Sequence, residues 1–284
     1  MKLTDCLLQF FDQYLSGVRG ASPHTVRAYR DTFSLFLPFA ARRSRCRIAE
    51  LDVERLSINL ILEFLDHLEK DRGNKAVTRN LRLAAFKSLA KMLRIVHPEQ
   101  QQVAERLLNI PQKREQKPLI GYLDQEEMLK VFEAVDLRRK EGFRDYTILH
   151  LLFDSGARAS EIVALKLDSF DSARKTLAIL GKGNRYRQIE LWPRTAQLLD
   201  QYIAHHRPNP RHGYTGCLFI NQRGEGFTRH GIYNLGKKYL TRALSTQRRA
   251  NLHPAHGFRH SSAMQWLASG ASLTDIKNRL GHDN

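Results

Sequence analysis

Apolar side chains recur every three to four residues through the first hundred positions, which is the spacing of one face of a helix. Ser22-Pro23 begins the second of four such runs with a capping hydroxyl before a proline, and His97-Pro98 ends the fourth. The predicted helices cover about residues 3–15, 23–37, 60–68 and 75–96. Because no strand pattern lies between them, these runs predict a small helical domain.

The pattern is mixed in the second half of the chain. A capping-box pattern at residues 124–127 precedes one predicted helix, and another predicted helix ends at Gly156. Residues 176–180 and 185–191 flank the sequence GKGN and predict a hairpin, whose glycines supply the turn conformations. The short apolar run at residues 217–220 is a candidate for one more strand. Further helices are expected from about residues 229, 258 and 273.

The two halves predict two domains. They are joined by the sequence PQKREQKPLIG, which has two prolines, three basic residues and no apolar stripe, and so predicts an extended linker. We expect a helical domain at residues 1–109, the linker at 110–120 and a second domain at 121–284. The predicted fold class is mainly α, with an α+β second domain that contains a small β-sheet or hairpin.

Basic residues outnumber acidic ones in both halves, which favours a polyanion as the partner. The 284 residues include 46 Lys and Arg against 29 Asp and Glu, a formal net charge of +17. Residues 1–117 contain 21 basic and 13 acidic side chains, and residues 118–284 contain 25 and 16. Two basic lobes suit a C-shaped clamp around a DNA duplex. The plainer alternative is a soluble protein that happens to be basic.

Several other classes are disfavoured. No apolar run approaches the roughly 18 residues of a membrane span, and the start has no signal-peptide pattern. The three scattered cysteines form no CxxC pair, which disfavours disulfides and structural zinc and favours a cytoplasmic location. His253, His256 and His260 lie close in sequence, but no cysteine or carboxylate completes a metal shell. We therefore expect neither a metal nor a cofactor.

A few positions carry the chemistry needed to cut or join a phosphodiester without a metal. The oxygens must be neutralised, the leaving oxygen protonated and a nucleophile activated. Arg158, at a helix start, and Arg259 suit the first task, since a guanidinium pairs two oxygens and stays charged. Lys182 in GKGN can protonate a departing oxygen, and His256 shares the side of Arg259 across a helix start. Each of them taken alone is more often an ordinary surface residue.

Together the motifs resemble the tyrosine recombinase, or phage integrase, family, of the Xer and integrase type. They are SGARASEIVALK, GKGNRYRQIEL, PAHGFRHSSAMQWLASG and IKNRLGH, in matching order and at matching intervals. The sequences SPHTVRAYRDTFSLFLPFA and TRNLR resemble the family's N-terminal core-binding domain, a SAM-like helical bundle. The likeness therefore covers almost the whole chain.

The resemblance implies a role for each matching residue. Arg158 and Arg259 match the two phosphate-binding arginines, Lys182 the hairpin lysine, His256 the histidine paired with the second arginine, His282 the last histidine before the nucleophile, and Glu161 the acidic support of the first arginine. In this family a tyrosine attacks DNA and leaves a 3′-phosphotyrosyl link and a free 5′ hydroxyl. The reverse step needs neither metal nor ATP.

The resemblance also implies a partner. This is double-stranded DNA with an inverted-repeat core site, bound by a homo-oligomer that is a dimer on the site and a tetramer in synapsis. A bacterial chromosome, phage or other mobile element is the typical source. The candidate DNA-binding residues lie on the second and fourth predicted helices and are Arg27, Arg30, Arg79, Arg82 and Lys87.

The sequence departs from the family after its last motif. The family's nucleophilic tyrosine lies several residues beyond the position of His282, and no tyrosine follows His282 here. Tyr233 and Tyr239 precede the His-Gly-Phe-Arg element and are expected to be packing residues. We therefore expect a chain that lacks its nucleophile and C-terminal helix, and so binds DNA without cleaving it. The tail was removed by design, lost naturally or left out of the reading frame.

Three functions fit these features. The leading one is a site-specific recombinase that is catalytically incomplete over these residues. The second is a DNA-binding module that never recombines, such as a regulator or competitor, and an in-frame tyrosine past codon 284 would separate it from the first. The third is a relaxing enzyme of the type IB topoisomerase kind, which shares the chemistry but usually acts without a specific site.

Overall fold

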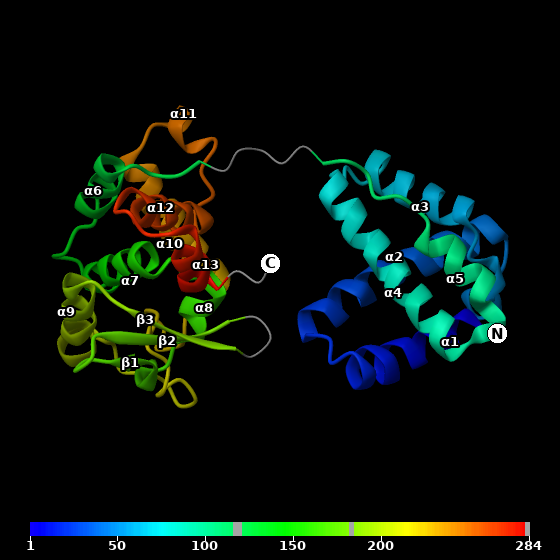
Figure 1. Cartoon of the computed structure of the whole chain (residues 1–284), viewed down its shortest axis with the longest axis horizontal. Helices are drawn as coiled ribbons and strands as arrows, with labels where there is room; N and C mark the ends of the chain where they lie inside the picture. The colour runs from blue at the N-terminus through cyan, green and yellow to red at the C-terminus, as the bar shows by residue number, and fades with distance from the viewer. Residues whose placement is uncertain (116–120, 182–184, 282–284) are drawn as a thin grey trace. The chain divides into compact units, whose positions relative to one another are not determined.

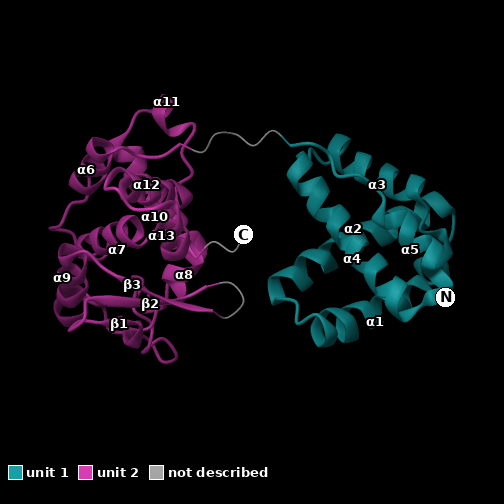
Figure 2. Cartoon of the chain, viewed as in Figure 1, with its two compact units in different colours: residues 1–117 teal, residues 118–284 magenta. Residues whose placement is uncertain are grey.

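The computed structural model describes residues 1–115, 121–181 and 185–281 of the chain. The chain divides into two compact units, Met1–Lys117 and Pro118–Asn284 (Figures 1 and 2). Each unit has its own cluster of buried apolar side chains. None of the described helices has the length and apolar character needed to cross a membrane.

The first unit is helical. Its described α-helices are α1 (Leu3–Gln9), α2 (Pro23–Ser44), α3 (Ile58–Lys70), α4 (Ala76–Val96) and α5 (Gln101–Leu108), with a π-helical continuation of α1 (Phe10–Val18) and short 3-10 turns at Ile48–Glu50, Val53–Arg55 and Pro98–Gln100. As the sequence predicts, Ser22 caps α2: its Oγ accepts a hydrogen bond from the N–H of Thr25 at 3.2 Å, with Pro23 in the first turn. The short helix α5 is an addition to the four predicted helices.

Aromatic rings form the centre of the first unit. Phe86 of α4 meets the rings of Phe33 and Phe36 of α2 edge-on, with centroids 5.1 and 4.9 Å apart, and Phe64 of α3 at 6.0 Å. Edge-to-face pairs of this kind add to the free energy that burial of the rings supplies. This cluster therefore fixes α4 against α2 and α3, and with it the face that α2 and α4 present to solvent.

The second unit contains a small sheet and a central buried helix, with its other helices packed around them. Its described helices are α6 (Gln125–Glu133), α7 (Gly142–Ser155), α8 (Ala159–Ala164), α9 (Pro193–Gln201), α10 (Arg229–Ala243), α11 (Thr246–Arg249), α12 (His256–Ala268) and α13 (Leu273–Leu280), with a 3-10 turn at Leu167–Ser169 and a π-helical turn at Tyr202–His206. The strands β1 (Phe170–Asp171), β2 (Thr176–Leu180) and β3 (Tyr186–Glu190) are antiparallel, in the order β1-β2-β3. The predicted hairpin is β2–β3, with Ile179 opposite Arg187.

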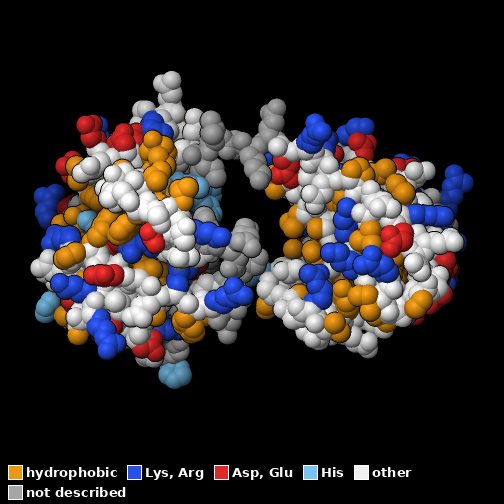
Figure 3. All heavy atoms as spheres, viewed as in Figure 1, with side chains coloured by type: hydrophobic (Ala, Val, Ile, Leu, Met, Phe, Trp, Pro, Cys, Tyr) orange, Lys and Arg blue, Asp and Glu red, His pale blue; other side chains and the backbone are white. Residues whose placement is uncertain are grey.

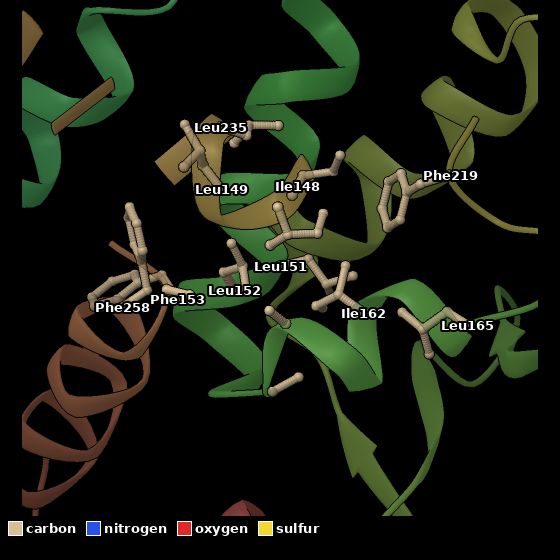
Figure 4. Packing of buried hydrophobic residues seen from close by; sticks show 14 of the residues in the cluster. Ile148, Leu149, Leu151, Leu152, Phe153, Ile162, Leu165, Phe219, Leu235 and Phe258 are labelled. Carbon is tan, nitrogen blue, oxygen red and sulfur yellow. The ribbon is translucent and has the colours of Figure 1, made fainter. Parts of the chain in front are cut away.

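Helix α7 is buried on nearly every side because it lies in the middle of the second unit. Its residues from Ile148 to Phe153 pack against Ile162 of α8, Leu235 of α10 and Phe258 of α12 (Figure 4). Since an interior this dense resists displacement, α7 is a rigid support for the loop that follows it. That loop and the start of α12 carry the candidate active site.

The prediction of a strand at residues 217–220 is wrong. Cys217 and Ile220 make only isolated bridges, to Lys166 and Gly226, and no ladder forms. The run is apolar because Leu218 and its neighbours are buried in the core, and burial alone does not require a strand. The predicted class, mainly α with a small β-sheet, is confirmed.

Candidate active site

Arg158 is held at the junction between α7 and α8. Gly156 ends α7 in the left-handed conformation, with φ of 58°, and the chain turns into α8. Glu161, in the first turn of α8, accepts a hydrogen bond from the main-chain N–H of Arg158 and another from its Nη1, both at 2.8 Å. The Arg158 side chain is still 34% exposed, so part of its guanidinium faces solvent.

Arg259, in the first turn of α12, is buried and joins two segments that are distant in sequence. Its Nη1 donates to the main-chain oxygen of Gly156 at 2.6 Å, and its Nη2 donates to that of Leu280, the last residue of α13, at 2.7 Å. Burial, followed by the nearby charge of Arg158, lowers the pKa of Arg259 to about 10. Arg259 therefore remains a cation at neutral pH.

His256 begins α12 on the exposed side of the same cluster. Its main-chain N–H donates to Nδ1 of His253 at 3.1 Å, and the two rings lie 4.8 Å apart. Partial desolvation lowers the pKa of His256, and the charges of His253, His260, Arg259 and Arg158 lower it further. A neutral imidazole at neutral pH can donate one hydrogen bond and accept another.

Positive charge predominates where these groups meet. Arg158, Arg187 and Arg259 surround a single buried carboxylate, that of Glu161. Burial opposes ionisation of Glu161, but hydrogen bonds from Arg187 and Arg158 outweigh it, and the pKa of the carboxyl is lowered. One carboxylate does not balance three guanidinium groups, so the cluster is suited to bind an anion.

A hollow of about 360 Å³ adjoins the cluster at His256. It is lined by Ala159, Arg229, His230, Tyr233, His253, Ala255 and His256, with no acidic residue among them. Tyr233 stacks on His230 and meets His253 edge-on. Tyr239, by contrast, is buried and donates from its hydroxyl to Asp145 at 2.8 Å, and burial raises its pKa. Tyr239 is therefore a packing residue, whereas Tyr233 reaches the site.

Residues 121–284 match the family model described as the phage integrase family, and residues 8–95 match the phage integrase N-terminal SAM-like domain. The chain belongs to the phage integrase family. The resemblance to tyrosine recombinases that the motifs indicate is thereby confirmed.

Known proteins similar to this integrase match it over nearly its whole length. An integrase/recombinase of Sinorhizobium fredii, named y4rC, is 35% identical over 285 residues, which are 99% of this chain and 85% of that protein. Tyrosine recombinase XerC of Oceanobacillus iheyensis is 28% identical over 100% of this chain and 90% of its own length. The XerH site-specific recombinase bound to its difH substrate matches in fold with a TM-score of 0.66 at 20% identity, covering 100% of this chain and 82% of that one.

The integrase site residues predicted from sequence have different outcomes. The structure brings together Arg158, Glu161, His256 and Arg259, which come from α8 and α12 and their approaches. Lys182 and His282 lie outside the described residues. Within the described part of the chain, no three His, Cys, Asp or Glu side chains are grouped to hold a metal ion.

Three of the five candidate DNA-binding residues have side chains on the surface of the first unit. Arg27 and Arg30 of α2 are exposed, and Lys87 of α4 is half-buried. Arg30 also lies over the ring of Phe11 and 3.7 Å from Asp12. On the face of this unit shown in Figure 3, Lys and Arg side chains gather where α2 and α4 cross. These positions remain candidates for phosphate contacts.

The other two candidates make hydrogen bonds that connect parts of the first unit. Arg82 donates from Nη1 to the main-chain oxygen of Ala28 at 3.2 Å and to Oγ1 of Thr32 at 3.1 Å, which ties α4 to α2. Arg79 is only 7% exposed, and its Nη1 donates to the main-chain oxygen of Pro111 at 3.1 Å. That Arg79 contacts DNA stays a prediction, while the structure shows its guanidinium buried against its own chain.

Sequence reasoning missed one residue of the integrase site, Arg187 on β3. Its guanidinium makes two hydrogen bonds to the Glu161 carboxylate, at 2.7 and 3.2 Å, and one from Nε to the main-chain oxygen of Arg279 at 2.9 Å. The available signal was alternation: Arg187 is two residues from the buried Ile189 and so shares its inward face. An arginine on an inward strand face requires a partner.

Proposed function

We propose that this integrase is a site-specific DNA recombinase that binds one phosphodiester of a duplex through Arg158 and Arg259. The observation that supports this most is the state of Arg259. It is a buried cation that donates to two main-chain oxygens, and among the described residues no carboxylate pairs with it. A bound phosphate would supply the missing negative charge, and a guanidinium matches two phosphate oxygens in geometry.

The proposed reaction conserves the energy of the phosphodiester. A tyrosine hydroxyl attacks phosphorus and gives its proton to the solvent, the bond to the 5′ oxygen breaks, and Lys182 gives a proton to that oxygen. Arg158 and Arg259 hold the non-bridging oxygens while charge builds on them, and neutral His256 donates a hydrogen bond to one of them. A 5′ hydroxyl of the partner strand then attacks the 3′-phosphotyrosyl link and releases the tyrosine. Neither metal nor ATP takes part.

Residues 1–284 contain no tyrosine after His282, the family position that precedes the nucleophile. We therefore propose that these residues by themselves bind DNA and do not cleave it. The proposed partner is a duplex with an inverted-repeat core site, bound by a dimer that pairs into a tetramer in synapsis. The cytoplasm is the proposed location. A basic surplus in both units supports a clamp in which each unit contacts the duplex.

Footprinting on DNA that flanks the gene tests this function. We expect protection of one inverted repeat, and at least a tenfold weaker binding for Arg158→Ala and Arg259→Lys, since each loses a charge-assisted contact worth about 1.5–3 kcal/mol. Arg174→Ala is the matched control, because Arg174 is 79% exposed and lies on the turn between β1 and β2. Thermal melting checks that each variant is folded.

Each other outcome favours a different function. Equal binding by Arg158→Ala, Arg259→Lys and wild type would contradict the proposal that these arginines bind a phosphate. Relaxation of supercoiled DNA with no protected sequence would indicate a topoisomerase-like enzyme. Protection of a site, with no in-frame tyrosine past codon 284 in the source DNA, would indicate a binding module that does not recombine.

A further inference from the structure

We propose that Arg187 is a positioning residue that sets Arg158 for the phosphate, acting through Glu161 rather than by touching DNA. This inference rests on the proposed function, since it assigns Arg187 a part in the same site. Arg187 projects from β3, whereas Arg158 and Glu161 belong to the start of α8, so the arrangement joins the hairpin to the phosphate site.

The first support is the geometry around Glu161. Arg187 donates from Nη2 to Oε2 and from Nη1 to Oε1, a two-point contact that fixes the carboxylate plane. Arg158 then donates to the same Oε1 at 2.8 Å from its Nη1. Glu161 is 5% exposed, so its orientation is set by these arginines and not by water. The direction of the Arg158 side chain therefore depends on Arg187.

The second support is the position of Arg187 between three segments. Its Nε donates to the main-chain oxygen of Arg279 in the last turn of α13. A side-chain carbon added at Gly281, which caps α13 in the left-handed conformation, would lie 3.0 Å from Nη1 of Arg187. One added at Gly181, which begins the GKGN turn, would lie 3.4 Å from the same atom. Gly281 therefore leaves room for the guanidinium, whereas a side-chain carbon at Gly181 would make only an ordinary contact with it.

The third support is that every side-chain nitrogen of Arg187 already donates to a protein partner. Nη1 and Nη2 donate to the Glu161 carboxylate, and Nε donates to the main-chain oxygen of Arg279. Arg158 differs, because it is 34% exposed and shows only Nη1 engaged by Glu161 among the described side chains. The two arginines therefore divide the work: one orients the carboxylate and the other reaches the ligand.

The test measures how much the charge of a single phosphate contributes to the affinity for DNA. The full chain of 284 residues is titrated with the duplex found by footprinting, and with duplexes in which one phosphate at a time is a neutral methylphosphonate. At the phosphate held by Arg158 and Arg259, we expect wild type to lose at least tenfold in affinity on neutralisation. The methylphosphonate ratio is the affinity for the unmodified duplex divided by the affinity for the duplex with that phosphate neutralised. Arg158→Ala should bring this ratio close to one, and Arg187→Gln should reduce it severalfold although Arg187 does not touch DNA.

A double-mutant comparison tests whether Arg187 acts through Arg158. If Arg187 acts through Arg158, then adding Arg187→Gln to Arg158→Ala changes the methylphosphonate ratio no further. Arg187→Lys should restore part of the ratio, because one charged donor to Glu161 remains. Two results would overturn the inference: a wild-type ratio in Arg187→Gln whose melting temperature alone has fallen, or a reduction that persists in the Arg158→Ala background. A wild type that is insensitive at every phosphate would instead contradict the proposed function itself.

Discussion

Arg259 donates a hydrogen bond of 2.6 Å to the main-chain oxygen of Gly156, which is 103 residues earlier in the chain. Gly156 has φ of 58°, and a side-chain carbon there would overlap Cδ2 of Leu280. Leu280 is also the residue whose main-chain oxygen accepts the other Nη of Arg259. Gly156, Leu280 and Arg259 therefore contact one another, and a side-chain carbon at Gly156 would press on the residue that also accepts a hydrogen bond from Arg259.

Gly156→Ala should destabilise the second unit and weaken DNA binding together. The left-handed conformation costs about 1–2 kcal/mol for a residue with a side chain, and the overlap with Leu280 adds to it. Denaturant unfolding measures the loss, and filter binding with the footprinted duplex measures affinity. Gly270→Ala is the control, since Gly270 also has positive φ but has no atom within 4 Å of the added carbon. Equal losses in the two variants would mean that the contact with Leu280 has no effect.

The helices and the hairpin were predictable because each has a local signal. Ser22-Pro23 caps α2, the apolar spacing marks α4, and alternation around GKGN marks β2 and β3. The run at residues 217–220 misled because burial and strand formation give the same apolar pattern over so short a length. Helix α5 was missed although it has an apolar face, because it is only eight residues long and begins just after the His97-Pro98 stop signal.

The site was predictable only as far as motifs name its members. Arg158 and Arg259 were found by motif, but their shared dependence on Gly156 and Leu280 arises from tertiary contacts that no spacing in the sequence reports. Arg79 also has a contact that the sequence does not report: this basic residue of α4 is buried because the chain after α5 folds over it, with Pro111 accepting its hydrogen bond. Sequence alone does not tell which side of α4 that segment covers.

Residues 1–117 should fold alone, because they contain a complete apolar core of their own. If the duplex is held by both units, this piece should bind DNA more weakly than the whole chain and with a shallower dependence on salt, since fewer phosphates are neutralised. Circular dichroism establishes folding, and binding at a series of salt concentrations gives the slope. Equal affinity and slope for the piece and the whole chain would contradict the clamp.

Arg27→Ala should weaken DNA binding without loss of stability. Arg27 is exposed on α2, so its removal costs one phosphate contact and should lower the salt slope by about one. Arg82→Ala should weaken binding and also lower the melting temperature, because Arg82 ties α4 to Ala28 and Thr32. Arg47→Ala is the charge-matched control, at an 85% exposed position beside Glu50. Wild-type binding by Arg27→Ala would move the DNA face elsewhere.

His150 should make the second unit acid-sensitive. Its ring stacks on Phe132 at 3.9 Å, its Nε2 has no partner among the described atoms, and burial, with the charge of Arg194 second, lowers its pKa to about 4. As pH falls below about 6.5, His150 becomes protonated in the unfolded chain but stays neutral in the folded chain. Stability should therefore fall by about 2–3 kcal/mol between about pH 6.5 and 4, then level off.

Denaturant unfolding at several pH values measures the acid loss, and His150→Phe should remove this part of it while keeping the ring stack. His212→Gln is the control, because His212 is exposed in a turn and changes the histidine count equally. An unchanged acid profile in His150→Phe would assign the loss to other groups.

Residues 1–284 should bind the recombination site and form no covalent adduct with it. The residues proposed to bind the phosphate, Arg158 and Arg259, lie in one cluster, but no tyrosine follows His282 in this sequence, and the proposed reaction requires a tyrosine oxygen to attack phosphorus. A suicide duplex, nicked so that the cleaved strand diffuses away, traps an adduct whenever a tyrosine attacks. Extending the chain with the codons that follow Asn284 in the source DNA should restore trapping if they encode a tyrosine, and changing that tyrosine to phenylalanine should abolish it again. Tyr233 is the internal alternative, since it lines the hollow beside His256. An adduct formed by the 284 residues and lost in Tyr233→Phe would make Tyr233 the nucleophile and contradict this prediction.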